Sequence, residues 1–66
     1  MNATSTLGIW DKNISEDVII RFDTTLSPER ITIQKKGENP LHYNFDAITA
    51  DEVEWAEDKA RELYNI

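Results

Sequence analysis

Three segments in the middle of the chain alternate apolar and polar residues. In DVIIRFD, the apolar residues Val18, Ile20 and Phe22 take every second position. A period of two predicts a strand with one buried face. The segments RITIQKK and LHYNFD repeat the pattern, with apolar residues at Ile31, Ile33, Leu41, Tyr43 and Phe45. We therefore expect three strands that turn their apolar residues to the same side.

The N-terminal region allows one more strand. The segment LGIWD fits a short edge strand over residues 7–11, with Leu7 and Ile9 on one side and Trp10 on the other. Because this segment is brief and contains Gly8, the predicted number of strands is three or four. Residues 1–6 are small and polar and follow no apolar pattern, so we expect a flexible end there.

The connections between the predicted strands are short. Ser27-Pro28 is a turn signal, because proline fixes φ and disfavours helix in the residue before it. The four residues GENP at 37–40 suit a tight hairpin. Consecutive strands joined in this way pair antiparallel, as a meander whose apolar face needs a cover.

The C-terminal segment predicts the helix that supplies this cover, over about residues 50–64. Thr49 and Glu52 fit a capping box, in which each side chain bonds the backbone amide of the other residue. At helical spacing one apolar stripe forms, made of Val53, Ala56, Ala60, Leu63 and Tyr64. Residues 1–66 therefore predict a single α+β domain, β(β)ββα: a three- to four-stranded antiparallel meander with one C-terminal helix on one face.

Charge is distributed unevenly along the 66 residues. The net charge is −6, and residues 51–66 hold six acids and two bases, a balance of −4. A negative field favours basic partners and opposes nucleic acid and anionic membranes. No segment is long and apolar enough to cross a membrane, and MNATSTLGIW lacks the basic flank and apolar run of a signal peptide. We expect a cytoplasmic protein of the producing or host cell.

The sequence offers little catalytic or metal-binding chemistry. It has no cysteine, a single histidine at His42 and only two glycines, so it lacks a thiol nucleophile, a zinc-ligand set and a phosphate loop. A catalytic pair of His42 as the base with Asp23 or Asp46 as its orienting acid is a weaker interpretation than an ordinary surface histidine. We expect no enzyme, no catalytic residue, no metal and no cofactor.

Alternation also defines the outward face of the predicted sheet. Its residues make a mildly basic, polar surface: Arg21, Arg30, Thr32, Gln34, Lys36, His42 and Asn44, with Ile19 as the apolar exception. Tyr43 and Phe45 are expected on the other face, so no aromatic platform for stacking bases is present here. Direct nucleic-acid binding is therefore not expected.

Trp55 does not fit the apolar stripe of the predicted helix. On a helical wheel it lies about 120° from the centre of that stripe, among acidic residues. Two interpretations stay open. As a structural residue, Trp55 folds over the sheet edge against Trp10 or Leu26, or lies under the Lys59 stem as a cation–π pair. As an interface residue, it anchors a contact that is rimmed by carboxylates.

Three hypotheses for function follow. The first is a non-enzymatic protein-binding module, an inhibitor or regulator by analogy with the small acidic proteins that phages and viruses direct at host enzymes. Its binding residues are Asp51, Glu54, Trp55, Asp58 and Glu62, and its partner is a larger protein with a basic surface. The alternatives are a nucleic-acid mimic that blocks a DNA- or RNA-binding protein and an assembly protein that forms homo-oligomers through its sheet edges.

Overall fold

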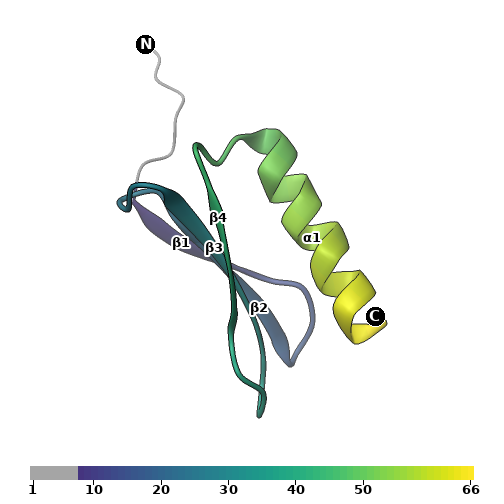
Figure 1. Cartoon of the computed structure of the whole chain (residues 1–66). Helices are drawn as coiled ribbons and strands as arrows, with labels where there is room; N and C mark the ends of the chain where they lie inside the picture. The colour runs from purple at the N-terminus through teal and green to yellow at the C-terminus, as the bar shows by residue number, and fades with distance from the viewer. Residues whose placement is uncertain (1–7) are drawn as a thin grey trace.

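The computed structural model describes residues 8–66, which form four strands followed by one helix (Figure 1). The strands run in the sheet order in which they occur along the chain, and each pairs antiparallel with the next. The elements are β1 (Ile9–Asn13), β2 (Val18–Asp23), β3 (Glu29–Lys35), β4 (Leu41–Phe45) and α1 (Ala50–Tyr64). The predicted α+β meander with one C-terminal helix is confirmed, whereas the flexible end expected at 1–6 lies outside the described residues.

The first strand exists, but its predicted bounds of 7–11 are wrong by two residues. It begins at Ile9, opposite Asp23, and continues to Asn13, opposite Ile19. Gly8 lies just before it with φ 120°, and its amide donates to the Thr24 hydroxyl at 2.7 Å. The later residues of the strand are polar, so its pairing with β2 extends it where the side-chain pattern gives no signal. Leu7 lies outside the described residues.

The core forms between the inner faces of β2 and β3 and the helix. The predicted inward residues of these two strands are all buried, and so are two alanines of the helix: Val18, Ile20, Phe22, Ile31, Ile33, Ala56 and Ala60. Small side chains on the helix let its backbone approach the sheet closely. Seven buried residues among residues 8–66 make a small core, so partly covered side chains at the sheet edges contribute a large share of the packing.

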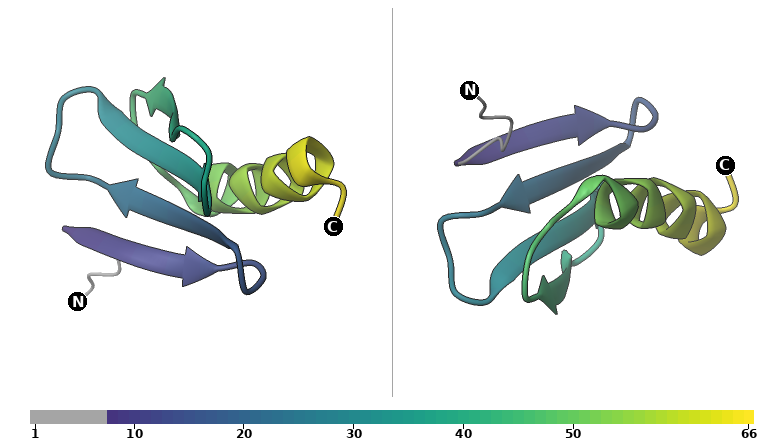
Figure 2. Two further views of the ribbon diagram at one scale, coloured as in Figure 1. Left: turned by 90° about the horizontal axis from the view of Figure 1, so that it is seen from below. Right: turned by 90° about the horizontal axis from the view of Figure 1, so that it is seen from above.

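The helix covers only the two central strands. Its α-carbons lie within 8 Å of those of β2 and β3, while in the described chain none lies that close to β1 or β4. The two views in Figure 2, from below and from above, show the helix on one side of the sheet. Strands are about 4.8 Å apart, so four of them span about 14 Å between the outer axes, and one helix of about 10 Å diameter cannot cover that width.

Two residues predicted to be covered are therefore exposed. Leu41, expected inward on β4, is 37% exposed, and Leu63, expected in the apolar stripe of the helix, is 38% exposed. Leu41 is opposite the buried Ile33, so it does point to the helical side of the sheet. It lies at the end of an edge strand that the helix does not reach. Leu41 thus lies on the predicted side of the sheet, but it is not buried as predicted.

Long side chains connect β1 to the core and to the helix. Trp10 stacks on Phe22 with the ring centroids 5.1 Å apart and the planes at 18°. Lys12, on the same side of the sheet, forms an ion pair with Glu57 of the helix. The edge strand is thereby attached to the helix across a gap that the backbones leave open.

The start of the helix is fixed by the predicted capping box, which is confirmed. The Thr49 side chain accepts from the backbone amide of Glu52 and also from the Asp51 amide, the latter at 3.3 Å. The Glu52 carboxylate accepts in turn from the Thr49 amide at 2.8 Å. One residue earlier, the Ile48 amide donates to a carboxylate oxygen of Glu29 in β3 at 2.7 Å. These bonds set the point at which the chain leaves the sheet and therefore the position of every side chain on the helix.

The capping box predicts a pH dependence of stability. Hydrogen bonds from the Thr49 hydroxyl and amide hold the pKa of Glu52 below its ordinary value of 4.5. A carboxyl whose pKa is lowered by folding stabilises the protein above its unfolded pKa, and that contribution is lost as pH falls through the folded pKa. We expect Glu52→Gln to lower the free energy of unfolding at neutral pH, with the difference from the parent protein disappearing well below pH 4.5.

Urea unfolding at a series of pH values measures this difference. Glu54→Gln is the matched control, because Glu54 is exposed on the same helix and takes no part in the capping box. We expect little pH-dependent difference for the control. Equal pH dependence in the two variants would contradict the role given to Glu52.

Candidate protein-binding face of the helix

The helix brings the five predicted binding residues together on its outer side. All of them are exposed in the structure: Asp51, Glu54, Trp55, Asp58 and Glu62. Their spacing of three and four residues places them on neighbouring turns of one face, away from the buried alanines. The structure thus places these residues on one exposed surface, and their role in binding stays a prediction.

Trp55 lies between the core and the solvent. Its ring meets Tyr43 and Phe45 of β4 edge to face, with centroid distances of 5.2 and 5.3 Å and interplanar angles of 80° and 71°. Edge-to-face aromatic pairs at this separation are favourable. Trp55 as a residue is nevertheless 37% exposed. Trp55 therefore covers the edge strand that the helix backbone does not reach and presents the rest of its ring outward.

The structural alternative was right that Trp55 folds over a sheet edge and wrong about Trp10 as its neighbour, while a contact with Leu26 stays untested. Trp10 is stacked on Phe22 near the opposite edge of the sheet, and the aromatic neighbours of Trp55 come from β4. In the described part of the chain, the cation found over an aromatic ring is Lys35, 5.5 Å from the centroid of Tyr64, and not Lys59. A helical wheel gives the direction of Trp55 but not the strand beside it, so sequence reasoning could not identify Tyr43.

A shallow groove runs along the helix beside Trp55. It has a volume of about 320 Å³ and is open to solvent, with Trp55, Asp58, Lys59 and Glu62 as its lining. An exposed part of an aromatic ring thus lies next to two carboxylates and one ammonium group. A hollow this open suits a side chain of a partner protein better than an enclosed small molecule.

Ion pairs restrain the acids of this face only weakly. Lys59 lies 3.6 Å from Glu62, and Arg61 lies 3.7 Å from Asp58, both at i,i+3 spacing; Lys59 is half-buried and the other three residues are exposed. Exposed pairs of this kind contribute about 0–1 kcal/mol. Asp51 takes part in none of the ion pairs found within residues 8–66, and its side chain is exposed to solvent. A basic partner can therefore reach all these carboxylates at small cost.

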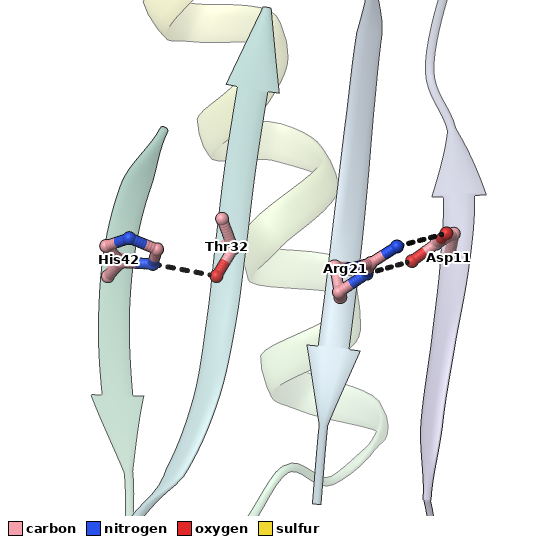
Figure 3. A network of polar contacts seen from close by, with 4 residues as sticks. All are labelled: Asp11, Arg21, Thr32 and His42. Carbon is pink, nitrogen blue, oxygen red and sulfur yellow. Dashed lines mark hydrogen bonds and ion pairs between the residues drawn. The ribbon is translucent and has the colours of Figure 1, made fainter. Parts of the chain in front are cut away.

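Two of the basic residues on the open face of the sheet have acidic neighbours in the adjoining strands. The Arg21 guanidinium donates to both carboxylate oxygens of Asp11 at 2.8 and 3.1 Å (Figure 3). This bond holds the pKa of Asp11 below and that of Arg21 above the ordinary values. Asp23 lies opposite Arg30 in the adjoining strands, so a second basic residue also has an acidic neighbour.

His42 has an ordinary structural neighbour on this open face. Its Nδ1 lies 2.9 Å from the Thr32 hydroxyl of the adjacent strand (Figure 3).

Among residues 8–66, no three histidine or carboxylate side chains converge on a position where they could hold a metal ion. The same residues include no helix with the length and apolar character needed to cross a membrane.

Comparison with known proteins adds no assignment. No protein-family model matches the sequence, and neither the curated proteins nor the solved structures compared with it include a match. The fold defines a class only in structural terms, a four-stranded antiparallel meander with a single covering helix. Any function has to be argued from the side chains that this fold presents.

The packing of Trp55 on β4 is testable by double-mutant cycle. We expect Trp55→Ala to lower the free energy of unfolding by about 2 kcal/mol, because two edge-to-face contacts and part of the ring's burial are lost. Combining it with Phe45→Leu should reveal a coupling energy of about 1 kcal/mol in denaturant unfolding. Trp10→Ala with Phe45→Leu is the control and should be additive. Additivity in the Trp55 cycle would contradict the contact.

Proposed function

We propose that this chain is a small acidic, non-enzymatic protein-binding module, an inhibitor or regulator that occupies a surface of a larger protein. Its binding face consists of five residues of the helix: Asp51, Glu54, Trp55, Asp58 and Glu62. The observation that carries the proposal is the position of Trp55. The residue is 37% exposed within a rim of carboxylates, although Tyr43 and Phe45 already hold its ring in place.

A ring held in this way is suited to binding. Part of the cost of association is the immobilisation of flexible side chains at the interface. The two contacts with β4 have already restricted Trp55, so docking a partner on its exposed part costs little further entropy. Tryptophan is enriched among the residues that contribute most to interface affinity, especially where polar groups surround it. The groove beside Trp55 gives such a partner a place to enter.

The charge of the face indicates the chemistry of the partner. Residues 51–66 have a balance of six acids to two bases, and the five binding residues include four acids. Complementary charge speeds association and excludes acidic surfaces, while the aromatic contact slows dissociation. The partner we propose has an apolar depression bordered by lysine or arginine residues.

Mimicry of nucleic acid is the alternative use of the same acids. A phosphate backbone has no counterpart to Trp55, which is partly exposed among these acids. This observation favours the aromatic anchor over mimicry. The two uses differ in salt dependence, because a mimic loses affinity steeply as salt rises, whereas binding through Trp55 retains much of its affinity.

Affinity capture with matched charge variants tests the proposal. Asp58→Asn/Glu62→Gln removes two acids from the binding face, and Glu16→Gln/Asp17→Asn removes two exposed acids from the loop between β1 and β2. We expect a protein captured from source-cell lysate to bind the helix variant about tenfold more weakly than the parent, because two rim charges together contribute about 1.4 kcal/mol. The loop variant should bind like the parent.

Binding measured with the purified partner at low and high salt completes the test. Trp55→Phe, which keeps a ring against β4, should stay folded and still weaken binding. Equal affinities for the helix and loop variants would contradict the proposed face. Steep loss of binding with salt, together with no effect of Trp55→Phe, would favour mimicry instead.

A further inference from the structure

Within residues 8–66, β1 and β4 are the edge strands of the sheet, and these two edges differ in how they are protected. β1 carries Asp11 and Lys12, and Lys12 lies on the inner side of the sheet, where it pairs with Glu57. Charged residues on an edge strand oppose pairing with another strand. β4 reads LHYNF, with no acid, lysine, arginine or proline inside the strand. The edge at β4 therefore lacks the protection that the edge at β1 has.

The inner side of β4 is also incompletely covered. Its inward residues are Leu41, Tyr43 and Phe45, and the helix backbone lies close to none of them. Trp55 covers the latter two in part, while Leu41 is 37% exposed. Beyond Leu41, a groove of about 590 Å³ continues between the β3–β4 hairpin and Leu63. An exposed apolar strip thus lies beside an open strand edge, a combination typical of an association surface.

We propose that β4 pairs with β4 of a second copy, antiparallel and about a two-fold axis at Tyr43. Tyr43 then lies opposite itself, His42 opposite Asn44, and Leu41 opposite Phe45. Two antiparallel strands can be related by a two-fold axis that passes through either a hydrogen-bonded or a non-hydrogen-bonded pair of residues. Tyr43 can therefore lie on the axis whichever peptide groups of β4 point outward. The two sheets join into one of eight strands, with both helices on the same face.

The strand is complementary to itself in this register. Each inward apolar residue meets an apolar residue, and each outward polar residue meets a polar one, as a two-fold interface requires. No like charges are brought opposite each other within the strand. A second copy therefore fits this edge without any change in the fold, and the inference does not depend on the proposed function of the helix.

The charge of −6 on each copy opposes this association by electrostatic repulsion. Each helix lies over β2 and β3, so the two helix axes are separated by four strand spacings, about 19 Å. This exceeds the Debye length of about 8 Å at physiological ionic strength. Salt screens the remaining repulsion, so added salt should strengthen the dimer. Binding of a basic partner by the helix is expected to weaken with salt, so the two proposals can fail independently.

Sedimentation velocity over a wide range of protein concentration, at low and high salt, tests the dimer. We expect a monomer–dimer equilibrium that salt shifts toward dimer. His42→Lys/Asn44→Lys puts lysine opposite lysine twice across the proposed interface, on side chains that point away from the core. This variant should weaken dimerisation about tenfold or more. Circular dichroism and thermal unfolding verify that it is folded.

A matched control and a rescue distinguish pairing at β4 from a general effect of added charge. Ile9→Lys/Asn13→Lys adds the same two positive charges on exposed residues of β1 and should leave the dimer intact. Mixing the β4 lysine variant with His42→Asp/Asn44→Asp should form a heterodimer, since opposite charges then face each other. A monomer at every concentration and salt, equal weakening by both lysine variants, or the absence of the heterodimer would each overturn the proposal.

Discussion

One helix is narrower than the four-stranded sheet it covers, and the other features of this molecule follow from that mismatch. The helix lies over β2 and β3, where alanines allow close approach and the large aliphatic residues of the strands are fully buried. Both edge strands then depend on long side chains. Trp10 and Lys12 connect β1 to the core and the helix, and Trp55 reaches β4 from the helix.

The same mismatch explains why Trp55 is both packed and exposed. A residue that must extend from the helix flank to an edge strand cannot be fully enclosed, because no further element lies beyond it in the described chain. The resulting surface combines a fixed aromatic ring, solvated carboxylates and the uncovered end of β4. The proposed binding face and the proposed two-fold pairing use different parts of this surface: the outer side of the helix in one case and the strand edge in the other.

The sequence was sufficient to predict the elements that repeat a strong local pattern. The alternation from Val18 to Phe22 and the capping box at Thr49 depend on neighbouring residues, and both were confirmed. The length of β1 and the exposure of Leu41 depend on pairing partners and on the position of the helix across the sheet. The neighbours of Trp55 depend on the same position, which no local pattern encodes.

Amide hydrogen exchange tests most directly whether Trp55 is what holds β4 against the helix. The comparison is between the parent protein and Trp55→Ala, at a concentration low enough to keep both monomeric. Edge elements with few buried contacts open locally at lower free energy than the core. We predict that the protected amides of β4 exchange much faster in the variant, while those of Ile20 and Ile31 change only as far as global stability changes. Unchanged exchange in β4, or an equal increase in every strand, would contradict the account.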